Sequence, residues 1–315
     1  MNKRKQFLWV VLGSMMLAGL TACSGDDDQT DVPDDGVRVR RITITQTDGA
    51  AARQVLTRAT LTEDDGLSAS WTAGDKLTYC NLSRSNYVYD AEVGEQVPKA
   101  YTGPLTAAST ATTSQFTGSV TCDRGDYLAV VYPATTFTTN ESYTILLAGQ
   151  DGTLGTLATK YHYVYGKAYV TSVTDNTADA TMEKMKSLLT VCKFSFVNKD
   201  GGAAIPIKTL AISYGGGAGQ SDVGTYPQTA TVAIGANTAQ TDVHATGVAG
   251  STPLTVTCPS AQDAVFVALL PTSGQRTFNF TVTDGSDNTY TGTDKATLTE
   301  GEYVVATGLK LTKNN

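Results

Sequence analysis

The sequence is poor in the residue types on which most enzymes and nucleic-acid-binding proteins depend. It holds two histidines among 315 residues, His162 and His244, which leaves little for a multi-histidine site or a His-dependent triad. Basic residues are also outnumbered, with 23 Lys and Arg against 30 Asp and Glu, for a net charge of −7. Such a chain lacks the basic surface that binds nucleic acid. We therefore expect no enzyme, no nucleic-acid partner, no cofactor and no metal site.

Long apolar runs are scarce too, and the clearest one is at the N-terminus. The run from Phe7 to Leu20 follows three basic residues and is too short for a permanent membrane span, which is typical of a signal peptide. The residues Leu20-Thr21-Ala22-Cys23 resemble the lipobox of bacterial lipoproteins, whose cysteine carries fatty acyl chains such as palmitate. We expect a signal peptide at 1–22, lipidation of Cys23 and attachment to a membrane through this lipid anchor.

The residues behind Cys23 are acidic. Ser24-Gly25-Asp26-Asp27-Asp28 resembles the export signal that sends lipoproteins of the Bacteroidota to the outer face of the outer membrane. The same residues fit a solvated tether, because the stretch 26–36 has almost no apolar content with which to order itself. Both interpretations assign 23–36 to an acidic tether, and the first places the protein on the outer membrane at the cell surface.

Short alternating runs of apolar and polar residues fill the chain from about Arg38 onward. Pairs such as Asp48-Gly49 and Asp284-Gly285 separate them and supply the positive φ that hairpin turns require. Helical periodicity is nearly absent, and Asp179 to Leu189 could make one or two helical turns but is too short to define a helical layer. We predict an all-β protein with strands at 41–47, 76–82, 127–132, 189–197, 207–214, 264–270, 277–283 and 303–311.

A weak internal repeat divides the chain. Val120-Thr121-Cys122 precedes an apolar strand that ends at Pro133, and Val256-Thr257-Cys258 precedes a similar strand that ends at Pro271. Chance similarity between valine- and threonine-rich strands would produce the same match. The simpler explanation is two related β-sandwich domains, at 37–180 and 181–315.

Four parts of the chain, in order, carry a family likeness. They are Leu56-Thr57-Arg58-Ala59-Thr60 with 69–77, 125–133, 163–168 with 185–189, and 266–271 with 298–303. Together with the lipobox they resemble the fimbrillin family of Bacteroidales, whose members are type V pilins. The resemblance implies two transthyretin-like β-sandwich domains in tandem.

The resemblance also implies a mechanism of assembly. Family pilins are exported as lipoproteins, are cut by an arginine-type protease after an N-terminal strand, and receive a strand from the next subunit. Arg58 matches the cleavage arginine, so a cut between Arg58 and Ala59 would release the strand at 41–47, with Arg53 as the alternative. The donor strand would come from the C-terminal end, where 303–306 and 309–311 flank Gly308.

The resemblance therefore implies a structural subunit of a surface fimbria that serves adhesion, with other fimbrial subunits and an arginine-type protease as partners. A stalk pilin needs a donor strand, a tip pilin needs only the acceptor groove, and an anchor subunit would keep its N-terminal strand. The sequence leaves these roles open. The competing interpretation is a surface glycan-binding lipoprotein, since β-sandwiches also hold sugars on exposed aromatic faces, and the chain has 15 tyrosines.

Four cysteines besides Cys23 remain, and they allow three disulfide pairings in an exported chain. The repeat places two in each half and favours Cys80 with Cys122 and Cys192 with Cys258. Four free thiols buried in strands are the equal alternative, because cysteine is among the most buried residue types.

Overall fold

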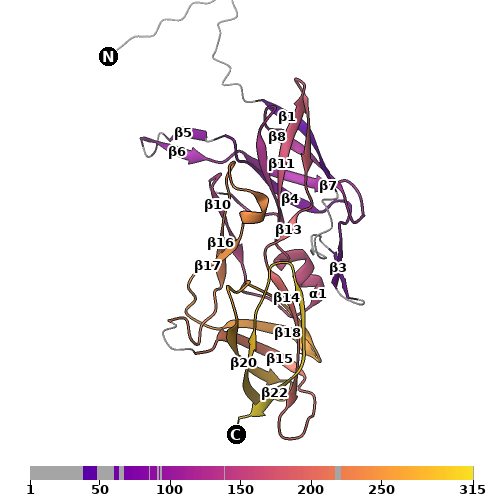
Figure 1. Ribbon diagram of the computed structural model, residues 1–315, viewed down its shortest axis with the longest axis vertical. Coiled ribbons are helices and arrows are strands. Elements are labelled where there is room, and N and C mark those ends of the chain that lie inside the picture. Colours follow the sequence, from indigo (N-terminus) through magenta and orange to yellow (C-terminus); the bar gives the residue numbers. More distant parts are fainter. Residues whose placement is uncertain are drawn as a thin grey trace, which may run out of the picture. The chain divides into compact units, whose positions relative to one another are not determined.

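Alternation of apolar and polar residues produces strands throughout the described chain. The computed structural model describes residues 38–47, 60–63, 67–84, 86–90, 92, 94–137, 139–216 and 221–314. The strands gather in two large sheets with smaller sheets beside them (Figure 1). The predicted all-β class is confirmed, and the two large sheets form barrel- and sandwich-like bodies.

The first large sheet has eight strands in the order β12-β1-β8-β7-β4-β9-β11-β13. Because β12 also pairs with β11, the sheet closes on itself as a barrel. β1 is thus an interior strand of a closed sheet. The strands are β1 (Val39–Gln46), β4 (Lys76–Asn81), β7 (Thr102–Ala107), β8 (Gln115–Thr121), β9 (Tyr127–Tyr132), β11 (Val164–Val173), β12 (Thr177–Met182) and β13 (Lys186–Ser187).

The second large sheet has seven strands in the order β18-β15-β20-β21-β22-β14-β19. The C-terminal strand β22 lies between β21, to which it is antiparallel, and β14, to which it is parallel. The strands are β14 (Thr190–Asn198), β15 (Ile207–Tyr214), β18 (Leu254–Gln262), β19 (Val265–Leu269), β20 (Arg276–Asp284), β21 (Thr289–Ala296) and β22 (Tyr303–Lys313).

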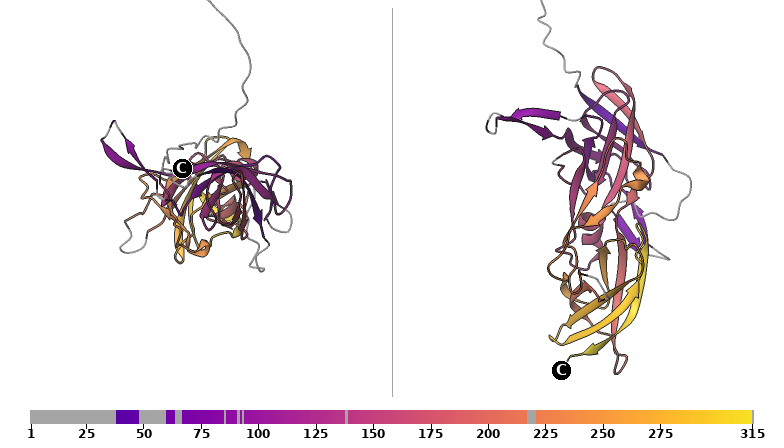
Figure 2. Two further views of the ribbon diagram at one scale, coloured as in Figure 1. Left: turned by 90° about the horizontal axis from the view of Figure 1, so that it is seen from above. Right: turned by 60° about the vertical axis from the view of Figure 1, so that its left-hand side comes forward.

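Three smaller sheets complete the described strands. A three-stranded sheet joins β10 (Ser142–Leu146) with β16 (Thr229–Ala233) and β17 (Ala245–Gly247), so segments from both halves of the sequence pair directly. β2 (Thr60–Glu63) pairs with β3 (Leu67–Ser70), and β5 (Asn86–Asp90) pairs with β6 (Glu95–Lys99) in a hairpin that projects from the other strands in Figures 1 and 2. The helical pieces are short: α1 (Leu154–Thr156), the π-helical η1 (Leu157–Tyr161) and the 3-10 turn η2 (Gln240–Asp242).

Two hydrophobic cores hold these sheets together. One lies inside the barrel and includes Trp71, which is fully buried and meets Phe116 and Tyr132 edge-on at ring centroid distances of 5.0 and 5.5 Å. The other contains residues of both halves of the chain, for example Ile145 and Phe196. Trp71 is therefore a core residue of the barrel.

The two large sheets adjoin in the sequence between β13 and β14, at Leu188 and Leu189. The shared core and the β10–β16 pairing unite the chain after Gly36 in one unit. The predicted division into 37–180 and 181–315 stays a prediction. Within the described residues, no helix has the length and apolar character needed to cross a membrane.

Candidate functional site

β1 lies in a slot between β8 and β12, and we call this space the β1 slot. The strand β1 pairs antiparallel with β8 from Val39 to Thr45 and parallel with β12 from Arg41 to Gln46. Its burial alternates, with Ile42 and Ile44 fully buried in the barrel core. On the β12 side their partners are Ala178 and Ala180, whose small side chains leave room for the isoleucines. β1 is therefore paired on both edges and buried on one face.

A buried arginine fixes the beginning of β1 in the slot. Arg40 is 6% exposed. Its Nη1 donates to the carbonyl of Cys122 and lies 2.8 Å from Asp123 Oδ1, and its Nε donates to the carbonyl of Thr174 at 2.7 Å. Charge-assisted bonds of this kind are strong when they are shielded from water. One side chain thus ties β1 to the end of β8 and to the turn between β11 and β12.

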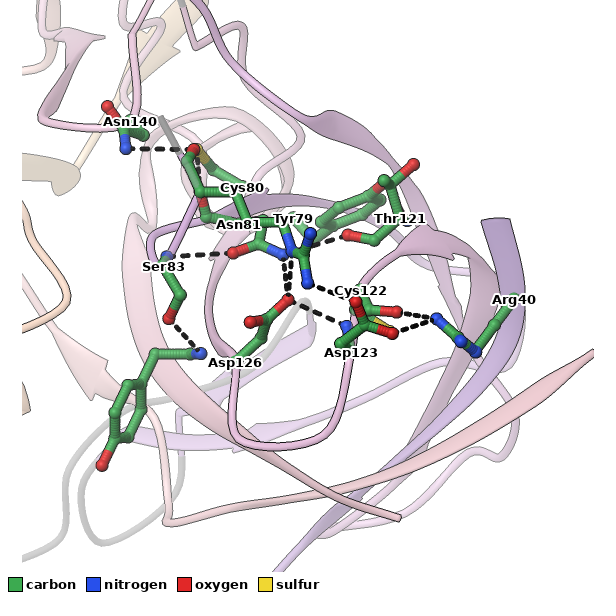
Figure 3. Close-up of polar contacts among 12 residues, drawn as sticks. Arg40, Tyr79, Cys80, Asn81, Ser83, Thr121, Cys122, Asp123, Asp126 and Asn140 are labelled. Carbon is green, nitrogen blue, oxygen red and sulfur yellow. Dashed lines mark hydrogen bonds and ion pairs between the residues drawn. The ribbon is translucent and has the colours of Figure 1, made fainter. Parts of the chain in front are cut away.

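The arginine belongs to a larger polar network, drawn in Figure 3. The other oxygen of Asp123 accepts from Arg84 Nη2, and Arg84 Nε donates to Asp126 Oδ2 at 2.8 Å. Asp126 also accepts from the Asn81 side-chain amide at 2.8 Å and from the Asp123 backbone N–H at 2.9 Å. The acidic side chains are held by donors from several segments, so the cation-binding end of the slot is preorganised without β1.

The opposite end of the β1 slot is polar but unsatisfied. Gln46 is 6% exposed, and neither its side-chain oxygen nor its side-chain nitrogen has a hydrogen-bond partner in the described structure. A buried polar group without a partner destabilises the state that buries it. β1 is thus well bound at Arg40 and poorly bound at Gln46.

The C-terminal strand β22 differs from β1 in burial. Leu311 is 1% exposed and Val305 is 56% exposed, and most of the remaining side chains of β22 are half-buried or exposed. Its pairing with β14 shifts register between Ala306 and Leu309, next to Gly308, whose φ is +68°. Glycine adopts this conformation without the strain that a Cβ would bring. β22 is thus two short strand segments joined at a bulge.

An apolar crevice accompanies β22. The pairing of β22 with β21 is confined to Tyr290 with Lys313 and Thr291 with Thr312. The earlier part of β22 faces a space of about 40 Å³. Phe194, Phe278 and Phe280 line this space together with Val304 and Ala306. The first half of β22 therefore has a strand on one edge and a gap beside the core on the other.

The beginning of β22 is tied to β2. Glu63 accepts two hydrogen bonds of 2.8 Å from Lys193 Nζ and a further bond from the Tyr303 hydroxyl. The bonds from Lys193 and then from Tyr303 lower the pKa of Glu63 below its usual value. The segment that follows the predicted processing site thus contacts the beginning of the C-terminal strand.

The four cysteines of the described chain are free and buried. Cys80 lies in the core shared by both halves and Cys122 lies in the barrel core, so they face different interiors. Burial raises the pKa of Cys80 to about 12 and that of Cys122 to about 11, which keeps both thiols protonated and unreactive. Of the two alternatives that the sequence left open for Cys80, Cys122, Cys192 and Cys258, the structure has the free thiols.

The other predicted site residues lie outside the described residues: Cys23, Arg53, Arg58 and Ala59. They stay predictions. The sequence analysis missed Arg40, Asp123 and Gln46. Arg40 could have been found, because it occupies the same parity as Ile42 and Ile44 and so must point into the core. Asp123 gave no such indication, since its partner Arg40 is far away in the sequence.

The histidines do not come together. His162 is 1% exposed, whereas His244 is exposed and its Nδ1 lies 2.8 Å from Glu300 Oε1. In the described part of the chain, no three His, Cys, Asp or Glu side chains are grouped as metal ligands would be.

A groove of about 540 Å³ runs over the outside of the barrel. Tyr127 on β9 and Tyr169 on β11 lie directly opposite each other, 37% and 42% exposed, with ring centroids 5.2 Å apart. Lys167 Nζ lies 4.4 Å from the centroid of the Tyr127 ring, and Glu183 and Thr181 also line the groove. The pair forms a small exposed aromatic surface beside polar groups.

No family model matches the chain, and neither does any curated protein. Solved structures do. A candidate cell adhesion protein from Bacteroides uniformis shares 14% identity over 90% of this chain and 98% of its own, with a TM-score of 0.50. A candidate adhesin from Bacteroides ovatus (12% identity, 88% of each chain, TM-score 0.36) and the shaft pilin SpaA from Lactobacillus rhamnosus GG (10%, 89% and 98%, TM-score 0.34) are more distant. The first likeness shows that the two chains share their all-β fold along almost their whole length.

Proposed function

We propose that this protein is a structural subunit of a surface fimbria, a stalk or tip pilin without catalytic activity. It is exported as a lipoprotein whose lipid is attached to Cys23, and an arginine-type protease then cleaves it after Arg58. Donor-strand exchange joins it to other subunits, and the fimbria serves adhesion. One observation supports this most: β1 is an interior strand of the barrel, yet it precedes the whole rest of the fold and is joined to it by a single connection.

The position of Arg58 gives that observation its meaning. Arg58 and the alternative Arg53 lie between β1 and β2, so a cut at either arginine leaves β1 attached by non-covalent contacts only. Loss of β1 then leaves unpaired N–H and C=O groups along β8 and β12, above a core that has lost Ile42 and Ile44. Such an edge pairs readily with an extended segment of another chain.

β22 has the properties of the donor in this scheme. It is the last strand of the chain, it is only partly buried, and the bulge at Gly308 divides it into segments at Tyr303–Ala306 and Leu309–Leu311. A strand with limited burial leaves its own sheet at lower cost than a deeply buried one.

Protease treatment and mutation test the proposal. We expect an arginine-type protease to give a subunit that begins at Ala59 and enters fibres, as read by N-terminal sequencing of assembled material. Arg58→Ala combined with Arg53→Ala should leave a soluble monomer, while Arg41→Ala, an exposed arginine within β1, should assemble normally. Assembly of the double variant at the normal rate would contradict the role of the cut.

The lipid anchor is tested separately. Cys23→Ala should release the protein from the membrane, and protease added to intact cells should reach the unmodified protein. Complete protection of the protein in intact cells would refute the surface location.

A second candidate function is glycan binding at the cell surface, favoured by the Tyr127–Tyr169 pair in the barrel groove. Two exposed tyrosine rings with carboxylate and hydroxyl groups nearby suit a saccharide ring. Tyr127→Ala with Tyr169→Ala should abolish glycan retention if this function holds, and Tyr101→Ala, which alters a tyrosine outside the groove, should not. If both variants assemble into fibres and the unmodified protein binds no glycan, glycan binding is excluded and the fimbrial function is the one that stays.

A further inference from the structure

The β1 slot has a different chemistry at each end. At one end the Asp123 carboxylate and the carbonyls of Cys122 and Thr174 receive the guanidinium of Arg40. In the middle, the barrel core receives two fully buried isoleucines. At the other end, Gln46 is buried without a partner. A strand that replaces β1 must therefore bring a cation to the first end, two apolar side chains to the middle, and no charge to the last.

A terminal strand suits the slot, because an internal strand is connected to the rest of its chain on both sides. Two internal strands also carry a basic residue followed by two apolar residues on the same face. The basic residue is Lys208 in β15 and Arg276 in β20. In the terminal strand β22, every second residue lies on the same face, and Leu309, Leu311 and Lys313 share one face. Their spacing is that of Ile44, Ile42 and Arg40, in the reverse chain order.

The order of these residues determines the direction of insertion. In the direction of β1, Leu309 and Leu311 would replace the isoleucines and Lys313 would replace Gln46. The ammonium would then be buried with no anion, while Asp123 would lack the cation that Arg40 supplies, and both changes are unfavourable. In the opposite direction, Lys313 meets Asp123 and the two carbonyls, and Thr307 replaces Gln46. A lysine ammonium has three donors for these three acceptors.

We propose that the β1 slot takes the C-terminal strand of a second copy of this chain, running opposite to β1, with Lys313 of the second copy beside Asp123. This inference rests on the proposed function and adds the partner, the register and the direction. The inserted strand is parallel to β8 and antiparallel to β12, the reverse of the pairings of β1. Exchange also replaces Gln46, whose buried amide has no partner, by a threonine.

The donor comes from another molecule because of where the two strands lie. β1 and the C-terminal end of β22 are at opposite ends of the unit in both side views (Figures 1 and 2). A strand from the same molecule would have to cross the barrel and the second sheet to enter the slot.

Peptide binding to the nicked full-length chain tests the charge requirement. The chain is cut with an arginine-type protease, and release of the fragment that ends at Arg58 and contains β1 is followed by mass spectrometry, while binding of a fluorescent peptide of residues 303–314 is followed by anisotropy. We expect Lys313→Glu in the peptide to weaken binding by about tenfold or more. Lys310→Glu is the matched control, since Lys310 alternates to the other face of the strand, and it should bind nearly as the unmodified peptide does. Asp123→Asn in the receptor should reduce the difference in affinity between the unmodified peptide and the peptide with Lys313→Glu.

Cross-linking tests the direction. The native thiols are buried, so they do not compete with introduced cysteines. The peptide carries Asn314→Cys, and each receptor carries one cysteine at an exposed site at one end of the slot. These receptor variants are Arg124→Cys, near Asp123, and Gln115→Cys, beside Thr45. We expect a disulfide with the first and little with the second. A disulfide confined to the Gln115→Cys receptor would overturn the reversed direction.

The outcomes separate this inference from the function on which it rests. Equal binding of the peptides with and without Lys313→Glu overturns the charge requirement and leaves strand exchange intact. Binding of another subunit's C-terminal peptide but not of this one overturns the second copy as partner and assigns a tip role. A nicked chain that keeps the fragment containing β1 and binds neither peptide refutes both the inference and the proposed function.

Discussion

β1 and β22 are both interior strands of large sheets, but the chain holds them in different ways. Along β1, every second side chain from Arg40 to Gln46 is buried, and both edges are paired over most of the strand. Along β22, one edge follows β14 and the other meets β21 only at Lys313 and Thr312, and Leu311 is the side chain that is nearly fully buried. β1 therefore contributes side chains to the centre of the barrel core, whereas β22 covers one side of the second core.

This difference bears on how each strand could leave its sheet. Release of β1 exposes two isoleucines and breaks the bonds of a buried arginine, so it needs either a cut chain or a competing strand. Release of β22 exposes less apolar surface per residue and starts from an existing gap beside the core. A fold that must lose one strand and offer another would place its deeply buried strand before a cleavable linker and its weakly held strand after the rest of the fold.

The largest expected effect is at Arg40. Arg40→Ala removes the buried donor to the carbonyls of Cys122 and Thr174 and a partner of Asp123, and should lower the free energy of unfolding by about 3 kcal/mol. Urea unfolding of the uncut chain measures it. Arg41→Ala, the exposed neighbour, should change stability by less than about 0.5 kcal/mol. Equal effects of the two variants would mean that the buried network does not hold β1.

The second effect compares the apolar residues of the two strands directly. Ile44→Ala should cost about 2–4 kcal/mol, because a fully buried side chain leaves a cavity in the barrel core. Leu309→Ala should cost about 1 kcal/mol, since its side chain is only half-buried on β22. Chemical denaturation gives both values. A larger cost at Leu309 would reverse the order of burial inferred for the two strands.

A third and smaller effect has the opposite sign. Gln46→Met replaces an amide that has no hydrogen-bond partner by an apolar side chain of similar length, and should stabilise the uncut chain by about 1 kcal/mol. Thermal unfolding is sufficient to detect it, and Thr45→Ser at the exposed neighbouring position is the control. Loss of stability in the Met variant would show that Gln46 is satisfied by water.

The sequence predicted the strands well where alternation is strong. Tyr127–Tyr132 and Ile207–Tyr214 have the predicted bounds, and β1 differs from its predicted range by two residues at the start and one at the end. The segment from Asp179 to Leu189, for which one or two helical turns were considered, instead contains the end of β12 and β13. Ala178, Ala180 and Met182 of β12 alternate with period two, but alanine is a weak strand former, and the pairing with β1 decides the conformation.

The polar network of the candidate site could not be predicted in the same way. Arg40 meets Asp123 and the Thr174 carbonyl across 83 and 134 positions of the sequence, and such pairs depend on which strands become neighbours. A parallel pairing such as β1 with β12 leaves no local turn pattern, unlike a hairpin. The closed barrel, and with it the two-edged slot, therefore appears only in the folded structure.

The smallest expected effect concerns the contact between β2 and the start of β22. Hydrogen bonds from Lys193 and Tyr303 lower the pKa of Glu63 in the folded protein below its ordinary value of 4.5. A carboxyl with a lowered folded pKa stabilises the fold fully above its unfolded pKa and loses that contribution as the pH falls through the folded value. The Glu63 side chain is 27% exposed, so the contribution at pH 7 should be below about 1 kcal/mol. Glu63→Gln should therefore be slightly less stable at pH 7, and the difference should shrink at pH values below the lowered pKa. Amide hydrogen exchange at Val304 and Val305 in both proteins would show whether this bond holds the first half of β22, and equal exchange at pH 7 would show that β22 is held by β14 alone.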